Sequence, residues 1–321
     1  MSKTKKRVVS AALVLTLGMT FLSSNPLPFS IAYAADASGT TASISEILKN
    51  QQADGGWKKD YSETKGEWAK STIDNKATYT EIRRLASEFK KTQNTKYSDA
   101  AIKGIQFLLN MQYENGGWPQ IYKASGYHRH ITYNDDAMIN VMILLDEVAN
   151  RKGDFSFVDK ALADKSRKAV EKGVECLLNT QVKVNGKLTA WGQQHDSSSL
   201  KPAGARAFEV PSLSSKESVT IVKFLKTRNS TSEISTAIKA AEDWFKTVKL
   251  TGIRVDKSGG DVKVVKDPSA SPIWARFYEI GTNKPIFVGR DGVVKYNLSE
   301  IEKERRTGYA WYGNWPASLV K

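Results

Sequence analysis

The sequence predicts an all-α-dominated fold, an (α/α) toroid of helical hairpins with a small irregular, β-containing C-terminal section. A Gly-Gly-Trp turn occurs in NQQADGGWKKD at residues 50–60 and again in NMQYENGGWPQ at residues 110–120. A looser third copy, NTQVKVNGKLTAWGQQ, spans residues 179–194. Each copy follows a short apolar run with helical spacing. A unit that recurs in this way is typical of a repeat architecture.

The helices can be followed in order along the chain. Periodicity begins at Ile44, and the later helical stretches are 77–92, 97–112, 135–150, 165–181, 215–229 and 231–250. Candidate N-caps are Ser98, Asn134 or Asp135, Ser214 with Glu217 as a capping box, and Thr231 or Ser232. After Gly252 the helical period fades into short strands and turns, with GRDG at 289–292 as a tight-turn signal. Because no linker is visible, residues 36–321 are expected to form a single domain.

The Gly-Gly-Trp turns themselves have a structural explanation. Glycine supplies the positive-φ positions that end a helix and reverse the chain. Trp57 and Trp118 are interpreted as anchors that pack back on the helices, in preference to platforms for sugar stacking. The repeat therefore indicates the fold and says nothing about the chemistry.

Residues 1–35 are expected to be a secretory signal peptide. They contain a basic start (Lys3, Lys5, Lys6, Arg7), an apolar run at 11–22 and the small-residue sequence Ala32-Tyr33-Ala34-Ala35. This order is typical of a cleaved export signal, and the apolar run is short for a bilayer span. The mature protein is thus predicted to be secreted and extracellular, with no membrane segment.

Charge and cysteine content narrow the possible classes. The net charge is +14, and removing the four cations of the leader leaves +10. A basic secreted protein suits an anionic partner such as an acidic polysaccharide, although composition alone favours a soluble protein that is simply basic. Cys176 is the one cysteine, so a disulfide framework and a cysteine metal site are excluded.

Three polar stretches are candidates for chemistry. In STIDNKATYTEI, Asp74 and Asn75 precede a helix and could equally be an N-cap pair. YHRHITYNDDAMINV places Asp135 and Asp136 at a helix start, where two adjacent carboxylates exceed what capping needs and suit Ca²⁺ or Mg²⁺. The third is the long loop TAWGQQHDSSSLKPAGARAFEVPSLSSKES, which carries Gln193, Gln194, His195, Asp196, Lys201, Arg206 and Glu209.

Taken together, these blocks resemble the pectate lyases of polysaccharide lyase family 10. The resemblance covers residues 43–317 and rests on DNKATYTEI, GGWPQ with YHRHITYNDD, TAWGQQHD, KPAGARAFEVPSLSSKES, PIWARFYEI with KPIFVGRDG, and ERRTGYAWYGNWP. It implies an (α/α) toroid and calcium-dependent β-elimination of polygalacturonate, with an arginine as the base.

The resemblance also implies roles for individual residues. Arg206 falls at the base, Asp136 at a calcium-linked aspartate, and Asp74 at an aspartate needed for activity. Arg276 and Arg290 fall at contacts with substrate carboxylates. Asp135, Asn75, Lys201 and His195 lie beside these positions; Asp135 is a second candidate for the metal and the other three are assigned to substrate binding.

The arginine base raises a difficulty, because guanidinium is ordinarily charged at all accessible pH values. A concentration of positive charge from Ca²⁺, Arg276, Arg290 and Lys201 is expected to lower the pKa of Arg206. The structural alternative is that Arg206 simply forms a salt bridge with Glu209. The late aromatics Tyr309, Trp311, Tyr312 and Trp315 could line a sugar groove or pack in the core.

Two rival functions remain at the level of sequence. A glycoside hydrolase on the same kind of toroid would use Asp74 and Asp136 as its two carboxylates. A non-catalytic binder of acidic wall polymers would need only basic charge and exposed aromatics. Nucleic-acid binding is not indicated, because the basic residues are scattered and no recognition motif is present. Nothing in the sequence indicates an oligomer, so a monomer is expected.

Overall fold

The computed structural model describes residues 41–320, so the predicted signal peptide at 1–35 lies outside the described residues. Its α-helices are α1 (Ile44–Asn50), α2 (Tyr79–Thr92), α3 (Thr95–Met111), α4 (Ala137–Ala149), α5 (Lys160–Thr180), α6 (Ser215–Leu225), α7 (Ser232–Thr247) and α8 (Lys303–Gly308). Within this part of the chain, no helix has the length and apolar character that crossing a membrane requires. The prediction of a helix-dominated toroid of hairpins is confirmed.

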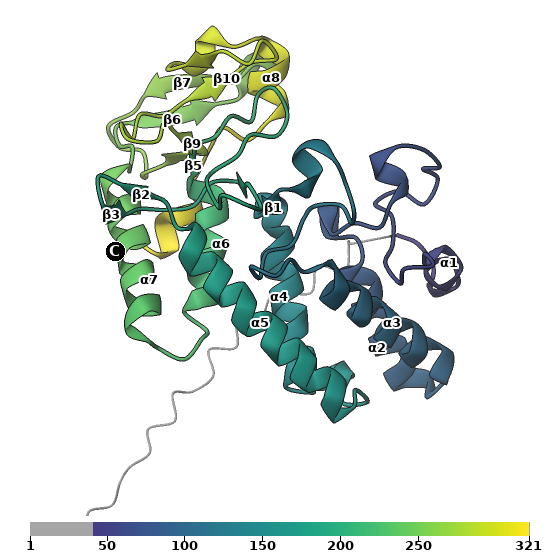
Figure 1. The fold of residues 1–321 in the computed structure, drawn as a ribbon. Coiled ribbons are helices and arrows are strands. Elements are labelled where there is room, and N and C mark those ends of the chain that lie inside the picture. Colours follow the sequence, from purple (N-terminus) through teal and green to yellow (C-terminus); the bar gives the residue numbers. More distant parts are fainter. Residues whose placement is uncertain (1–40, 321) are drawn as a thin grey trace, which may run out of the picture. The chain divides into compact units, whose positions relative to one another are not determined.

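Three helical hairpins make up the body of the fold. The pairs α2–α3, α4–α5 and α6–α7 lie side by side in Figure 1, and each pair is in direct contact. Across the pairs, α2 contacts α4 and α4 contacts α6, while α3 contacts α5 and α5 contacts α7. The helices therefore form two rows, and the main hydrophobic core fills the space between them.

A repeated tryptophan contact joins each turn to the helix before it. Trp57 and Trp118 are fully buried, and their indole Nε1–H groups donate to the carbonyls of Ile47 (2.7 Å) and Leu108 (2.8 Å). Trp191 does the same to Leu177 at 2.7 Å. These bonds satisfy carbonyls in the last turn of a helix, which have no partner inside the helix. The interpretation of Trp57 and Trp118 as anchors is thus confirmed.

A fourth copy of this contact was not visible in the sequence. Trp274 is buried, and its indole donates to the carbonyl of Phe245 in α7 at 2.8 Å. The sequence showed no fourth copy because this tryptophan has no Gly-Gly before it and lies 29 residues after its acceptor. The same contact, which we call the tryptophan lock, therefore occurs at one end of all three hairpins and at the end of α1.

A glutamine directly after each of α1, α3 and α5 adds to this contact. Gln51 Nε2 donates to the carbonyl of Gly55 and to that of Ala100 in α3, both at 2.9 Å. Gln112 makes the same two bonds, to Gly116 and to Ala169 in α5. Gln181 bonds to Thr189 and to Ala237 in α7 in the same way. Each glutamine side chain therefore ties a turn to the next hairpin of the row.

The first glycine of each Gly-Gly pair is required by both conformation and space. Gly55 and Gly116 have φ angles of +101° and +86°. A Cβ on Gly55 would lie 2.5 Å from the carbonyl oxygen of Lys103, and one on Gly116 would lie 2.0 Å from that of Lys172. The turn therefore packs directly on the backbone of the neighbouring helix, as glycine alone permits.

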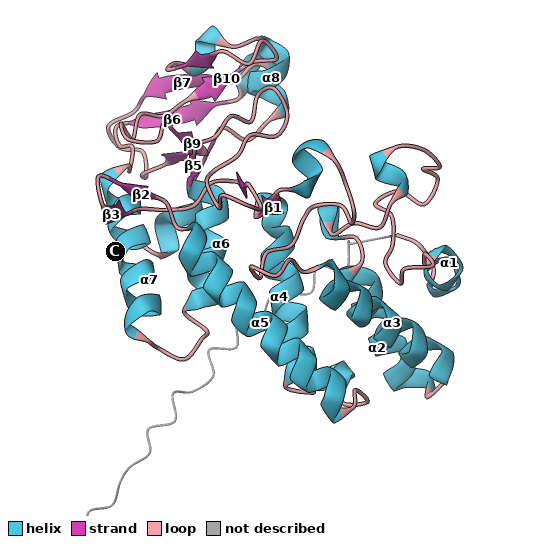
Figure 2. Cartoon of the chain, viewed as in Figure 1, coloured by secondary structure: helices cyan, strands magenta, loops and turns pink. Residues whose placement is uncertain are grey.

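Short antiparallel strand pairs connect the long loops above the helices (Figure 2). β1 (Ile131–Thr132) pairs with β4 (Gln194–His195), and β5 (Leu213–Ser214) pairs with β9 (Phe277–Tyr278). β2 (Lys183–Val184) pairs with β3 (Lys187–Leu188). These pairs bring the polar stretches around residues 130, 195, 215 and 276 to one end of the hairpins.

The C-terminal section consists of short strands, as the sequence predicts. β6 (Ile253–Asp256) pairs with β7 (Lys263–Lys266), β8 (Trp274–Ala275) with β12 (Tyr312–Gly313), and β10 (Phe287–Val288) with β11 (Val294–Lys295). The GRDG turn connects β10 to β11, with Gly292 at φ +72°. A second, smaller hydrophobic cluster around Phe287 and Trp311 supports this section.

Several expected helix starts differ in the structure. Asn94, not Ser98, caps α3, because the helix already begins at Thr95 and the Asn94 side chain accepts from the N–H of Lys96. Ser214 occupies the N-cap position of α6, but its hydroxyl donates to the Glu217 carboxylate and accepts no backbone N–H, so the capping box is incomplete. Thr231 caps α7 as predicted.

The close packing of Gly116 on the neighbouring helix gives a direct test of the fold. We expect Gly116→Ala to lower the free energy of unfolding by about 3 kcal/mol or more, because a Cβ must displace the helix backbone as well as adopt a positive φ. Gly153→Ala is the matched control, since Gly153 also has a positive φ (+59°) but open space around its Cβ position. Its expected cost is about 1 kcal/mol. If urea denaturation shows that both variants lose the same free energy of unfolding, the packing argument is contradicted.

Candidate active site

Two kinked helix entries carry candidate acidic residues. Asp74–Lys76 and Asn134–Asp136 are short 3₁₀ turns directly before α2 and α4. Asn75 (φ 45°) and Asp135 (φ 50°) are left-handed within these turns. Non-glycine residues in this region cost energy and are concentrated at functional sites. Asp74 caps no helix, so its interpretation as an N-cap is wrong.

Asp74 is buried and held by side chains from two other loops. Its Oδ1 accepts from Gln120 Nε2 at 2.9 Å, and its Oδ2 accepts from Lys59 Nζ at 2.8 Å. Gln120 Oε1 in turn faces His128 Nδ1 at 2.8 Å. Burial lowers the pKa of His128, so the neutral ring is favoured with Nδ1–H as the donor to Gln120. The carboxylate is thereby fixed in one orientation.

Arg206 lies in the long loop between β4 and β5 and is paired with Glu209. Its Nε and Nη2 donate to the two carboxylate oxygens of Glu209 at 2.7 and 2.6 Å. Glu209 also accepts from Gln193 Nε2 (2.9 Å) and from the Tyr309 hydroxyl (3.0 Å). The salt bridge that the sequence offered as a structural alternative for Arg206 is therefore present.

A hydrogen-bonded chain joins Arg206 to the start of α4. Gln193 Nε2 donates to Asn134 Oδ1 at 2.7 Å as well as to Glu209. Asn134 Nδ2 then donates to Asp135 Oδ2 at 3.0 Å. Residues from two distant loops are thus held in one polar network.

Arg276 extends this network from the C-terminal section. Its Nη2 donates to Glu217 Oε1 at 2.6 Å and lies 3.4 Å from Asn134 Oδ1. Its guanidinium also stacks on the ring of Tyr309, 4.6 Å from the ring centroid. Burial opposes ionisation of Glu217, but Arg276 and Lys216 outweigh it and hold the pKa of Glu217 below its ordinary value.

Asp135 and Asp136 differ in environment. The Asp136 Oδ1 accepts from the Thr220 hydroxyl at 2.6 Å, and burial raises the pKa of Asp136. Asp135 is half exposed, with Lys216 Nζ 3.6 Å from its Oδ1. Among residues 41–320, no three His, Cys, Asp or Glu side chains are grouped as a complete metal site. Two adjacent carboxylates nevertheless fit a hard cation whose other oxygen ligands come from water or a bound anion.

The assignment of His195 to substrate binding is wrong. The side chain is completely buried, its Nε2 accepts from the Gly192 N–H (3.0 Å), and its Nδ1–H donates to the Leu200 carbonyl (2.8 Å). Burial lowers the pKa of His195 to about 4. Both ring nitrogens therefore serve the loop backbone, and no surface of the ring is left for a ligand.

The remaining predicted contacts lie at the surface. Asn75 and Lys201 are exposed, and Lys201 forms no ion pair with any residue of 41–320. Arg290 is exposed and donates through Nε and Nη2 to Glu304, at 3.0 Å each. Arg290 lies within 6.0 Å of the Phe208 ring, which Arg206 also covers at 4.7 Å. Arg290 is thus near Arg206.

The expected lowering of the Arg206 pKa is not found in the protein alone. The Glu209 carboxylate raises the pKa of Arg206 through two short hydrogen bonds. Arg276 and Arg290 are each paired with a carboxylate of their own, Glu217 and Glu304. Positive charge near Arg206 is therefore largely neutralised by neighbouring side chains.

Several network residues were not assigned to the site from the sequence. They are Lys59, Gln120, Asn134, Lys216 and Glu217. A sequence signal did exist, because Lys59, Gln120, Gln193 and Arg276 each lie two residues after a locking tryptophan. Each of these four side chains points at an acid or amide at a helix entry.

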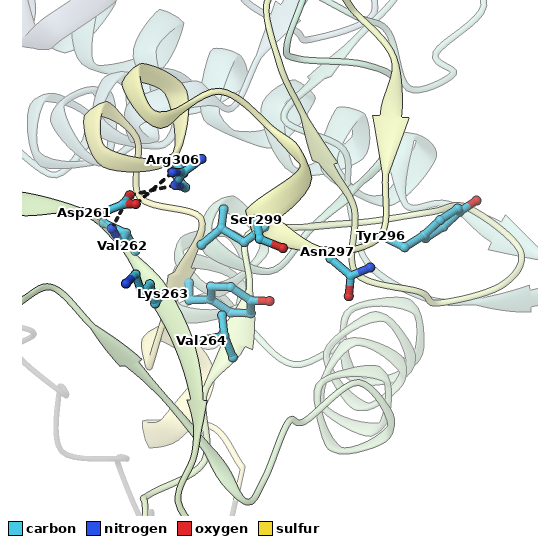
Figure 3. Close-up of a pocket in the computed structure, with 10 residues that line it drawn as sticks. Asp261, Val262, Lys263, Val264, Tyr296, Asn297, Ser299 and Arg306 are labelled. Carbon is cyan, nitrogen blue, oxygen red and sulfur yellow. Dashed lines mark hydrogen bonds and ion pairs between the residues drawn. The ribbon is translucent and has the colours of Figure 1, made fainter.

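The late aromatics serve mainly as core. Trp311 is buried, and Tyr309, Tyr312 and Trp315 are half-buried. A pocket of about 520 Å³ lies in the C-terminal strands, and Figure 3 shows its lining around Lys263, Asn297 and Ser299. Asp261 and Arg306 at this pocket bind each other, and Tyr312 also lines it, but no residue of the polar network around Arg206 does. It is therefore separate from the polar network around Arg206.

The fold and this network define a helical toroid with a site rich in arginine and carboxylate groups. Residues 43–320 match the family model described as pectic acid lyase, so the chain belongs to that family. Two similar solved structures are a family 10 polysaccharide lyase from Cellvibrio cellulosa and a mutant of it in complex with trigalacturonic acid. The native structure is 38% identical with a TM-score of 0.81, covering 89% of this chain and 93% of that one.

The mutant complex is equally similar. It is 37% identical with a TM-score of 0.81, and the match covers 89% of this chain and 94% of that chain. The comparison with curated proteins gives no match. The family and both structures identify the class of activity as that of a polysaccharide lyase, acting in pectate degradation.

The buried His195 predicts a pH dependence of stability. Its pKa is about 4 in the folded protein, below the ordinary value of 6.5. Because the unfolded chain binds a proton first as the pH falls, stability is full above about pH 6.5 and is lost progressively toward pH 4. We expect urea denaturation to show this loss in the wild type. In His195→Gln the free energy of unfolding should depend less steeply on pH over this range. An unchanged slope would contradict the assignment of this pH dependence to His195.

Proposed function

We propose that the protein is a calcium-dependent pectate lyase that cleaves α-1,4-polygalacturonate by β-elimination. The observation that carries the proposal is the network from Arg206 through Glu209, Gln193 and Asn134 to Asp135. It unites a candidate base with a candidate metal ligand from a distant loop. The likeness to a lyase solved with trigalacturonic acid supports the same substrate class here.

The arginines suit a polyanionic substrate. Arg206 is 48% exposed in its side chain and Arg290 is 64% exposed, so both guanidinium groups can meet carboxylates of the polymer. Guanidinium binds carboxylate through paired hydrogen bonds, which also fix its orientation. Arg276 is buried and acts by holding Glu217 and Tyr309, so we assign it to the wall of the site and not to direct substrate contact.

The proposed reaction is a proton transfer followed by loss of a leaving group. The C5–H bond of a galacturonate breaks, and its proton passes to an unprotonated nitrogen of Arg206. The electron pair of that bond forms the C4–C5 double bond, and the C4–O bond to the leaving sugar breaks. The leaving oxygen takes a proton from water. Proton transfer by a positioned group of this kind contributes about 10²–10⁴-fold to rate.

Asp135 and Asp136 are the residues proposed to hold calcium. A carboxylate with a pKa raised by burial gains from a cation beside it, as Asp136 would. When bound, the cation neutralises the substrate carboxylate next to C5 and makes the C5 proton easier to remove. Asp74, fixed by Lys59 and Gln120, is proposed to position the substrate on the other side of the site.

The predicted export signal and the polymeric substrate support a secreted enzyme, which we propose acts as a monomer. The net charge of +10 that remains without residues 1–35 would favour encounter with the acidic polymer. This attraction should weaken as salt is added.

The central experiment follows near-ultraviolet absorbance while the protein acts on polygalacturonate at alkaline pH. We expect a rise from the unsaturated uronide, its loss with a chelator, and its recovery with added calcium. Arg206→Ala should lower kcat by at least about 10²-fold because the base is gone. Arg83→Ala is the control, since Arg83 also pairs with a glutamate, Glu147, ten residues along α4 from the site.

Three other outcomes would overturn the proposal in whole or in part. New reducing ends without absorbance would indicate hydrolysis, with Asp74 and Asp136 as the carboxylates to test. If neither product forms and the Arg206→Ala variant still binds the polymer, the result would indicate a non-catalytic polysaccharide binder. A rise that a chelator leaves unchanged would remove calcium from the mechanism but keep elimination.

A further inference from the structure

Glu209 is placed unusually well to control Arg206. The two side chains form a paired contact, with Nε on Oε2 and Nη2 on Oε1. The backbone N–H of Arg206 also donates to Oε2 at 3.3 Å, and the N–H of Glu209 donates to the Arg206 carbonyl at 2.8 Å. The five-residue loop Ala205–Glu209 thus closes on itself around this ion pair.

Glu209 is itself fixed from behind by two other parts of the chain. Gln193, next to β4, and Tyr309, just after α8, both donate to its Oε1. The Glu209 side chain is only 5% exposed. A carboxylate with this many donors cannot move far without losing several bonds, so it forms a rigid base for the guanidinium.

Arg206 is arranged differently, with one side of its guanidinium free. Its side chain is 48% exposed, and Nη1 makes no hydrogen bond to any residue of 41–320. The Phe208 ring lies under the guanidinium at 4.7 Å and prevents it from folding away. The contacts to Glu209 and Phe208 therefore leave Nη1 as the nitrogen that can reach a ligand.

The charges that face Arg206 come from several elements. Glu209 belongs to its own loop, and the others are Tyr127 from the turn before β1, Tyr309 after α8, Arg290 after β10 and Arg305 on α8. Arg290 and Arg305 share one carboxylate, Glu304, which balances one of their two positive charges. Glu209 is the one carboxylate in hydrogen-bond contact with Arg206 in the described chain, and it accounts for most of the rise in the Arg206 pKa.

We propose that Glu209 is the positioning residue of Arg206, holding Nη1 toward the substrate and setting the pH range in which Arg206 accepts a proton. This inference rests on the proposed function, because it assumes that Arg206 is the base. Glu209 touches Arg206 and not the reacting atoms. Its effect on the reaction therefore passes through the orientation and the charge state of the guanidinium.

The two parts of the proposal can be separated by substitution. Glu209→Gln keeps the size but removes the charge, whereas Glu209→Asp keeps the charge but is too short for the same paired contact. The matched control is Glu147→Gln, which removes the carboxylate of another Arg–Glu pair, that of Arg83. Each variant is compared with the full-length wild type on polygalacturonate, with kcat and KM measured across pH and folding checked by thermal unfolding.

The expected results differ between the variants. Glu209→Gln should move the midpoint of the rising limb of kcat/KM about 1 pH unit or more to the acid side, because the cationic form of Arg206 loses its partner. Its plateau kcat should fall about tenfold from lost orientation. Glu209→Asp should keep the wild-type midpoint and lose kcat. Glu147→Gln should match the wild type in both.

Two results would overturn the inference. If folded Glu209→Gln has the same midpoint of kcat/KM against pH as the wild type, Glu209 does not govern the charge state of Arg206. If Glu209→Gln fails to fold, Glu209→Asp decides, and a wild-type kcat in that variant would exclude a positioning role. In both cases the wild type still forms unsaturated product. A wild type that forms none would instead mean that the proposed function itself has failed.

Discussion

The structure depends on one repeated interaction, the bond from a buried indole N–H to a carbonyl in the last turn of the preceding helix. Trp57, Trp118, Trp191 and Trp274 all make it, at 2.7–2.8 Å. The carbonyl would otherwise be unpaired in the interior, at a cost of about 1–3 kcal/mol. Each tryptophan is also buried, so it holds the segment that follows the helix against the end of that helix.

The site follows from this regularity. The residue two positions after each locking tryptophan is directed toward a helix entry. Lys59 reaches the entry of the hairpin that follows it, whereas the other three reach the entry of the hairpin before them. Lys59 and Gln120 meet at Asp74, Gln193 meets Asn134, and Arg276 meets Glu217. A repeat that serves packing thus presents four equivalent positions around one end of the toroid. The chain has used them to hold acids and amides in place, with kinked entries at Asp74 and Asn134 that an uninterrupted helix would not provide.

Charge balance within the site matters more than the net charge of the chain. Arg206, Arg276 and Arg290 each have a glutamate partner, although the sequence as a whole carries +14. Pairing of this kind fixes the geometry of a guanidinium and favours its charged form, which Arg206 must lose before it can accept a proton as the proposed base. It also means that a bound polyanion must compete with, or add to, contacts that already exist. In such a site the guanidinium groups are well oriented, but their attraction for the polyanion is weaker than that of unpaired arginines.

The sequence alone determined the helical hairpins, the anchoring role of Trp57 and Trp118, the strand-rich C-terminal section and the family. These follow from local periodicity, turn chemistry and contiguous motifs. It did not reveal that His195 is buried, that Asp74 is not a cap, or that Gln193 joins Glu209 to Asn134. The contacts of Gln193 join residues that are 16 and 59 positions apart in the sequence. Burial and partner choice at that separation are decided only when the hairpins pack, because packing determines which polar groups lose water and must find one another.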